Sequence, residues 1–176
     1  MPWTAQDRRQ APPDTGGPYL TDQLKQQIAQ VYLPRYPSKR AALLPALHLV
    51  QHEHGWLPLG AIREVAELLE ISPAEALDTA TFYEEYWLKP KGKYLIQVCR
   101  SLACEICGSN ALTSHLRAKL NIDPGGTTPD GRFTLVELEC LGACDGAPAM
   151  LVNQTLYTDL TPQKADALLA SLPREA

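Results

Sequence analysis

The sequence predicts an α+β protein, in which a helical bundle is followed by an α/β domain. Apolar residues recur at helical spacing through about residue 87, and beyond residue 93 short apolar runs that suit strands alternate with helical segments. Residues 89–93 contain proline and glycine and separate the two patterns. We expect three parts: a mobile tail (1–18), a helical domain (19–90) and an α/β domain (91–176).

Four helices are expected in the helical domain. Three apolar stripes have the spacing of a single helix face: Leu24, Ile28, Val31 and Tyr32; Leu43, Leu47 and Val50; Ile62, Val65, Ala66 and Leu69. Pro45 must lie near the start of the second helix or kink it, because proline lacks an N–H. A fourth helix is expected to begin at Ser72, whose hydroxyl can accept the Glu75 amide hydrogen bond while the Glu75 side chain reaches back.

The α/β domain is expected to have the element order β-α-β-β-β-α. The expected elements are strand 94–98, helix 109–121, a loop at 123–132, strand 133–139, strands 149–152 and 155–157 joined at residues 153–154, and a last helix that begins at Thr161 and Pro162. A strand–helix–strand unit followed by a hairpin and a helix is the arrangement of a thioredoxin-like core. The sequence therefore predicts a thioredoxin-like fold for this domain.

Composition and missing motifs exclude several function classes. The net charge of −4 leaves no excess of Lys and Arg for a nucleic-acid backbone. The longest apolar stretch, residues 41–50, is too short to cross a bilayer, and the N-terminus lacks the apolar core of a secretory signal. No glycine-rich nucleotide-binding motif and no Ser/His/Asp set is found. We expect a reducing, cytoplasmic location, no nucleic acid, no membrane insertion and no complete active site.

The five cysteines carry the main signal, since all lie between residues 99 and 144. Four of them form a Cys-x4-Cys pair and a Cys-x3-Cys pair: Cys99, Cys104, Cys140 and Cys144. Each pair begins just past a predicted strand, and in an open sheet ligands bind beyond the carboxyl ends of the strands. We therefore expect adjacent strands to bring both pairs of thiols to one edge of the sheet.

Thiols gathered in this way are typical of a metal site. Four thiolates need a cation, and soft sulfur selects iron–sulfur clusters, zinc or copper(I). Spacers of four and three residues suit a binuclear cluster, in which each iron takes two thiolates. The small residues Gly142, Ala143 and Gly146 allow the backbone to approach sulfur closely and to direct N–H groups toward it.

Several further motifs accompany the cysteines. They are Gly92-Lys93-Tyr94, Val98-Cys99, Glu139-Cys140-Leu141-Gly142-Ala143-Cys144, Ala147-Pro148, Thr81-Phe82-Tyr83, residues 127–131, and residues 40–58 with their His-Gly-Trp-Leu-Pro ending. Together they closely resemble the family of the thioredoxin-like [2Fe–2S] subunit of respiratory NADH:quinone oxidoreductase (complex I). The likeness extends over about residues 20–172.

The resemblance implies the function. It implies that Cys99, Cys104, Cys140 and Cys144 hold one [2Fe–2S] cluster, which exchanges electrons with the FMN of a partner subunit that also binds NADH. The chain is then a non-catalytic electron-transfer subunit of the respiratory chain, held at the inner face of the membrane through its complex and its other peripheral subunits. Equivalent subunits of NAD-linked hydrogenases and formate dehydrogenases are the alternative.

Cys107 departs from the family pattern and leaves two rival functions. It forms Cys-x2-Cys with Cys104, so either residue could be the second ligand, although the match of Cys99 and Gly108 to the family favours Cys104. The same motif occurs in thiol–disulfide oxidoreductases. A structural zinc site formed by Cys104, Cys107, Cys140 and Cys144 is the second rival.

The remaining candidates have simpler interpretations. His48 and His52 are four residues apart but lack a third ligand nearby, so a partly exposed helix face is expected. Five aromatic residues are expected in the core or at an interface: Trp56, Phe82, Tyr83, Tyr86 and Trp87. Beside the cysteines, Asp145 and Glu105 should oppose reduction of a cluster, and Arg100 should favour it.

Overall fold

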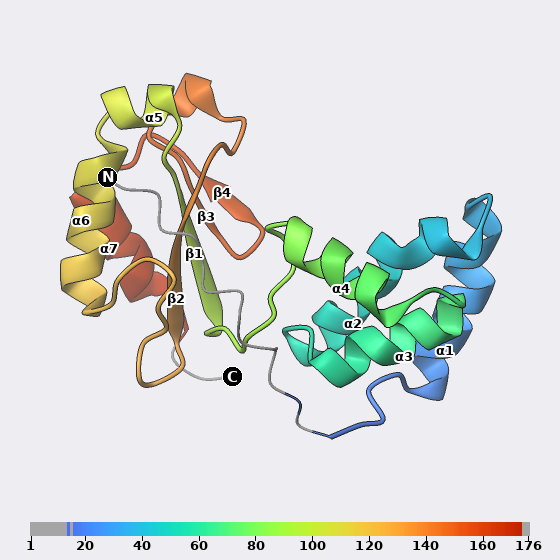
Figure 1. The fold of residues 1–176 in the computed structure, drawn as a ribbon. Helices are drawn as coiled ribbons and strands as arrows, with labels where there is room; N and C mark the ends of the chain where they lie inside the picture. Colours follow the sequence, from blue (N-terminus) through green and yellow to red (C-terminus); the bar gives the residue numbers. More distant parts are fainter. Residues whose placement is uncertain (1–13, 15, 174–176) are drawn as a thin grey trace. The chain divides into compact units, whose positions relative to one another are not determined.

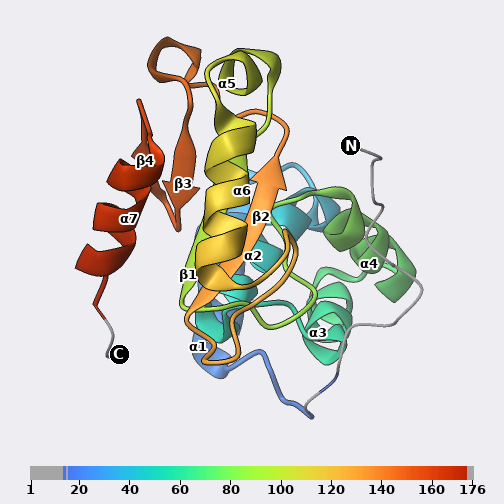
Figure 2. The ribbon, with the colours of Figure 1, turned by 90° about the vertical axis from the view of Figure 1, so that its left-hand side faces the viewer.

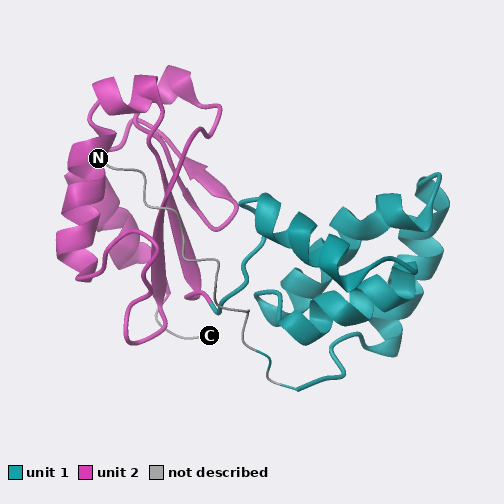
Figure 3. Ribbon diagram, in the orientation of Figure 1, with its two compact units in different colours: residues 1–90 teal, residues 91–176 magenta. Residues whose placement is uncertain are grey.

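The computed structural model describes residue 14 and residues 16–173 and contains two compact units, residues 1–90 and 91–176 (Figure 3). Most of the expected tail at 1–18 lies outside the described residues. Each unit has its own hydrophobic core. No helix in the described part of the chain is both long enough and apolar enough to cross a membrane.

The first unit is helical, as the sequence predicts. Its helices are α1 (Asp22–Gln27), α2 (Leu43–His54), α3 (Leu59–Leu69) and α4 (Pro73–Phe82), with shorter turns η1 (Ile28–Tyr32), η2 (Leu33–Arg35) and η3 (Lys39–Ala42). The predicted apolar stripes of α2 and α3 are buried, and Pro45 occupies the first turn of α2, where its missing N–H costs nothing.

Two local expectations in this unit are wrong. The first stripe continues from α1 into a π-helical turn, which has more residues per turn than an α-helix, and Val31 is 39% exposed, outside the core. At the start of α4 the Ser72 hydroxyl accepts a hydrogen bond from the Ala74 amide at 3.3 Å, not from Glu75. The Glu75 carboxylate instead forms an ion pair with Arg40, which keeps it from reaching back to Ser72.

The second unit contains a four-stranded sheet in the order β2-β1-β3-β4. The strands are β1 (Tyr94–Cys99), β2 (Phe133–Leu138), β3 (Met150–Val152) and β4 (Thr155–Tyr157). β1 and β2 are parallel, and the other two pairs are antiparallel. This is the predicted strand–helix–strand unit followed by a hairpin.

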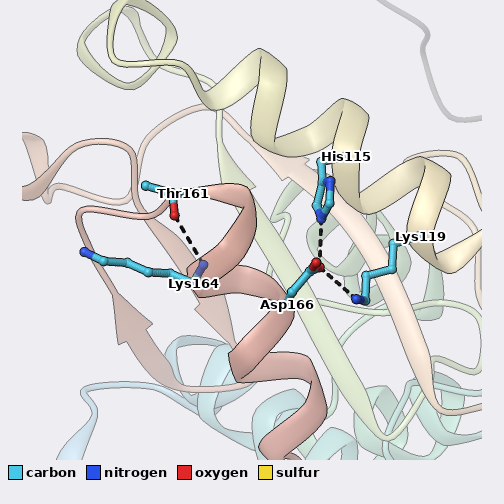
Figure 4. A network of polar contacts seen from close by, with 5 residues as sticks. All are labelled: His115, Lys119, Thr161, Lys164 and Asp166. Atoms are coloured by element: carbon cyan, nitrogen blue, oxygen red, sulfur yellow. Dashed lines mark hydrogen bonds and ion pairs between the residues drawn. The ribbon is translucent and has the colours of Figure 1, made fainter.

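Helices α6 (Ser109–Leu120) and α7 (Pro162–Ser171) lie side by side over one face of the sheet (Figures 1 and 2). Leu112 and Leu116 of α6 and Leu169 of α7 are buried against the strands. Across the outer surface of the two helices, Asp166 accepts hydrogen bonds from His115 Nε2 at 2.7 Å and Lys119 Nζ at 2.9 Å (Figure 4). Apolar packing and these polar contacts together fix α7 against α6.

The predicted element order omits one helix, α5 (Leu102–Ile106), between β1 and α6. α5 is only five residues long, and its apolar residues Leu102 and Ile106 face solvent, so the sequence has no buried stripe to reveal it. The second predicted strand also ends one residue early, at Leu138, which places Cys140 two residues beyond β2. These differences all fall at the end of the sheet where the cysteines lie.

Candidate metal centre

Cys99 and Cys104 meet in the interior of the second unit. Cys99 is the last residue of β1, and its amide donates a hydrogen bond to the Ala149 carbonyl at 3.1 Å. Cys104 is the third residue of α5, and the two side chains are 2% and 1% exposed. They form a small apolar cluster with Ala143 and Ala149. The turn from β1 into α5 thus brings two thiols together out of contact with water.

The second pair lies on the loop that follows β2. Cys140 is exposed, and its sulfur accepts a hydrogen bond from the Gly142 amide at 3.3 Å. Gly142 adopts a φ of +70°, which favours glycine, and this turn directs its N–H to the sulfur. Cys144 begins the short turn η4 (Cys144–Gly146) and is also exposed.

A close contact holds this loop in place. A Cβ atom on Gly146 would lie 2.6 Å from the Cβ of Thr158, so only glycine fits there. The Gly146 carbonyl also accepts a hydrogen bond from the Asp159 amide at 2.7 Å. The loop is therefore fixed against the segment that follows β4.

The parallel register explains why the two pairs share one end of the sheet. Cys99 lies opposite Leu138, so the chain after β2 emerges beside the end of β1. In Figures 1 and 2, α5 and the turn at residues 144–146 lie at this same end. We call it the cysteine end of the sheet, formed by Cys99, residues 100–107 and residues 139–146. The expectation that neighbouring strands bring the cysteine pairs to one edge is confirmed.

Cys99 and Cys144 both lie close enough to Cys104 to affect its pKa. Burial raises the pKa of the Cys104 thiol, and a hydrogen bond with Cys99 and the nearby Cys99 and Cys144 sulfurs raise it further. A backbone hydrogen bond with Ala149 acts in the opposite direction. Thiolates gathered in this way repel one another unless a metal cation offsets their charge, so the set of donors fits a thiolate-bound metal centre.

The structure does not bring the four cysteine side chains into a closed site. Among the described residues, no three or more His, Cys, Asp or Glu side chains are grouped closely enough to hold a metal ion. Cys107, the fifth cysteine, is exposed at the end of α5, where its amide donates to the Ala103 carbonyl at 3.0 Å. Cys104 on α5 is thus buried, whereas Cys107, which caps the C-terminus of α5, is exposed.

Charged groups surround the cysteine end. Arg100, expected to favour reduction, forms an ion pair with Glu139, and its Nε lies 2.9 Å from a carboxylate oxygen. Its positive charge is therefore partly offset locally. Glu105 accepts a hydrogen bond from the Asn110 side chain at 3.0 Å, and Asp145 is exposed.

His48, His54 and Tyr86 of the first unit take structural positions. The His48 ring packs on Tyr86 with centroids 4.8 Å apart, and His54 Nε2 lies 3.0 Å from the Tyr19 carbonyl oxygen. Burial raises the pKa of Tyr86, whose hydroxyl donates to the Leu44 carbonyl at 2.9 Å. Phe82, by contrast, is 75% exposed, so it lies outside the core.

Known proteins resemble this chain over most of its length. Residues 28–173 match the family model described as thioredoxin-like [2Fe-2S] ferredoxin. A subunit of NADH-quinone oxidoreductase from Rhizobium meliloti (strain 1021) is 44% identical over 137 residues, which cover 78% of this chain and 82% of that protein. NADH-quinone oxidoreductase subunit 2 of Thermus thermophilus is 40% identical over 151 residues, with 84% and 83% covered.

A solved structure shares the fold. The NAD+-reducing [NiFe]-hydrogenase in its air-oxidized state superposes with a TM-score of 0.66 at 32% sequence identity. The match covers 74% of this chain but only 23% of the hydrogenase chain. The likeness therefore concerns one part of a larger chain.

Proposed function

This chain belongs to the thioredoxin-like [2Fe–2S] ferredoxin family, and we propose that it is the subunit of an NADH:quinone oxidoreductase that exchanges electrons with the FMN of a partner subunit. The observation that carries the proposal is the pairing of parallel strands β1 and β2, which sends both cysteine pairs to the cysteine end of the sheet. The relatives named above are subunits of oxidoreductase complexes, which supports an electron-transfer role.

We propose Cys99, Cys104, Cys140 and Cys144 as the ligands of the [2Fe–2S] cluster. The contact between Cys99 and Cys104 and the influence of Cys144 on the Cys104 pKa support a shared site. When bound, the cluster supplies one-electron transfer chemistry. The protein's part is to exclude water on the side of Cys99 and Cys104 and to donate the Gly142 N–H to the Cys140 sulfur.

In this assignment the chain has no active site of its own. Oxidation of NADH belongs to the partner subunit, and this chain accepts or returns single electrons. It is peripheral to the inner face of the membrane through its complex.

EPR spectroscopy of anaerobically purified protein tests the cluster. We expect a spin-half signal only after dithionite reduction, with iron and sulfide in equal amounts and no stoichiometric zinc. Stoichiometric zinc without the signal would instead identify a structural zinc site. A metal-free protein with a reactive Cys104 would identify a thiol–disulfide oxidoreductase.

The electron partner is tested separately. NADH should reduce the cluster only when the purified FMN-bearing subunit is present, and the appearance of the reduced EPR signal reports the transfer. A second candidate, the equivalent subunit of an NAD-linked hydrogenase, is favoured by the structural likeness to the hydrogenase chain. Hydrogen-dependent reduction through a hydrogenase partner would establish that alternative.

A further inference from the structure

Ser109 carries a buried hydroxyl without a hydrogen-bond partner. It is the first residue of α6 and is 1% exposed, and its Oγ makes no hydrogen bond to any residue that the structure describes. A serine hydroxyl in a helix commonly donates to the carbonyl four residues back. For Ser109 that carbonyl belongs to Glu105, which instead accepts from the Gly108 amide at 3.1 Å.

This lack of a partner is unusual among the buried polar groups. Thr134, which is also 1% exposed, accepts a hydrogen bond from the Gly92 amide at 2.6 Å. Within the described part of the chain, Arg132 Nε is the one other buried side-chain atom without a partner, and that guanidinium donates through Nη2 to the Leu172 carbonyl at 2.7 Å. A buried hydroxyl that bonds to nothing costs stability, so Ser109 Oγ indicates a partner present in the working protein.

Ser109 lies at the cysteine end of the sheet. The buried face of α6 is formed by residues at helical spacing: Ser109, Leu112, Thr113 and Leu116. The helix that joins two parallel strands begins beside their carboxyl ends, which is where ligands bind in such sheets. In Figures 1 and 2 the start of α6 adjoins α5 at this end. Ser109 is therefore the residue of the buried face that lies nearest to the cysteines.

The N-terminus of α6 provides further donors at the same place. The first amides of a helix have no acceptor within the helix. The N-cap here is Gly108, with a φ of +100°, which has no side chain to accept from them. Its carbonyl accepts from the Ala111 and Leu112 amides, both at 3.1 Å. A group that accepts hydrogen bonds from the Ser109 hydroxyl and the first amides of α6 therefore fits at this end of the sheet.

We propose that the Ser109 hydroxyl donates a hydrogen bond to a sulfur atom of the bound [2Fe–2S] cluster and so raises its reduction potential. This inference rests on the proposed function and adds a residue that is not a ligand. Hydrogen bonds to the sulfurs of a cluster tune its potential, because they stabilise the form that has gained an electron. A cluster sulfur is thus the acceptor that the buried hydroxyl lacks.

A redox titration of the full cluster-loaded chain, followed by EPR, tests the hydrogen bond. In Ser109→Ala the ratio of reduced to oxidised cluster at a fixed potential should fall about threefold, which corresponds to about 28 mV for one electron. Ser109→Thr keeps a hydroxyl and should titrate as the wild type does. The control Ser114→Ala removes an exposed hydroxyl from the same helix and should leave the potential unchanged.

Pulsed EPR of the reduced cluster, assembled in D2O, distinguishes a direct hydrogen bond from a change in packing. The wild type and Ser109→Thr should show a coupled exchangeable deuteron that Ser109→Ala lacks. If Ser109→Ala does not load with iron and sulfide, Ser109→Gly, which leaves no buried methyl group, serves for the same comparison.

The outcomes separate this inference from the proposed function. An unchanged potential in the variant without the hydroxyl, or a lowered potential with the deuteron coupling retained, would overturn the inference and leave the electron-transfer role standing. A wild type that shows no spin-half signal after dithionite reduction would instead overturn the proposed function itself.

Discussion

At the scale of single residues, Cys104 and Cys107 present the sharpest contrast. They are three residues apart at α5, yet Cys104 is buried beside Cys99 and Cys107 is exposed. A cluster ligand must lie near the other sulfurs, and the inward side chain of Cys104 lies beside Cys99. The spacing of the cysteines allows either Cys104 or Cys107 to be the second ligand. The burial of Cys104 and the exposure of Cys107 distinguish the two thiols.

Exchange of each thiol for a hydroxyl tests this difference. We expect Cys107→Ser to keep wild-type iron, sulfide and reduced EPR signal, and Cys104→Ser to lose most of all three, because serine is a poor ligand for soft metal. Cys140→Ser, on the partner loop, should likewise fail to assemble the cluster. Loss of the cluster in Cys107→Ser with retention in Cys104→Ser would reverse the ligand assignment.

The sequence could predict the cysteine pairs but not the environment of each thiol. Cys-x4-Cys and Cys-x3-Cys after two predicted strands were enough to place both pairs at one sheet edge. The inward turn of Cys104 depends on α5, whose exposed Leu102 and Ile106 invert the usual amphipathic pattern. The ion pair that offsets Arg100 depends on strand register, because Glu139 follows the neighbouring strand β2.

At the scale of elements, the start of α4 shows how a tertiary contact overrides a local motif. Ser72 and Glu75 have the spacing of a reciprocal cap, but Glu75 pairs with Arg40 from η3. Only the Ser72 half of the motif forms, with the Ala74 amide as donor. The existence and the start of α4 were predictable from the cap residues, whereas the partner of Glu75 was not, because Arg40 is distant in sequence.

Unfolding in urea distinguishes the two halves of this cap. Ser72→Ala should lower the free energy of unfolding by about 1 kcal/mol, the typical value of an N-cap hydroxyl. Glu75→Gln should cost less, since it weakens only a partly exposed ion pair. A larger loss for Glu75→Gln than for Ser72→Ala would mean that the reciprocal cap forms in solution.

The contact between α6 and α7 makes stability depend on pH. Hydrogen bonds from Lys119, and next from His115, hold the pKa of Asp166 below its ordinary value. A carboxyl whose pKa is lower in the folded state contributes stability above its unfolded pKa, about 3.9, and loses it as pH falls through the folded pKa. Urea unfolding between about pH 7 and pH 2 should show this loss.

Two variants isolate the Asp166 contribution. In Asp166→Asn, the free energy of unfolding should fall less between neutral and acid pH than it does in the wild type. Lys119→Met should show part of this effect, because Lys119 is the largest cause of the lowered Asp166 pKa. If both variants follow the wild-type curve at acid pH, the contacts seen between α6 and α7 do not persist in solution.

At the scale of the whole molecule, the chain places its helical core and its sheet core in separate units. The first core uses residues from Tyr19 to Tyr86, and the second uses residues from Tyr94 to Leu169. All five cysteines, and every contact described for the candidate metal centre, lie in the second unit. The change of period in the sequence reflects this division, because helix faces and strand faces need different spacings of apolar residues.

The separate cores predict that residues 91–176 fold without the helical unit. This fragment contains the whole sheet, α5, α6, α7 and the four proposed ligands, so it should give a cooperative unfolding transition and the same reduced EPR signal as the full chain. The fragment with Cys140→Ser is the matched control and should fold without a cluster. A fragment that folds but assembles no cluster would show that the helical unit contributes to the metal centre. One that does not fold would show that the sheet core depends on the helical unit for its stability.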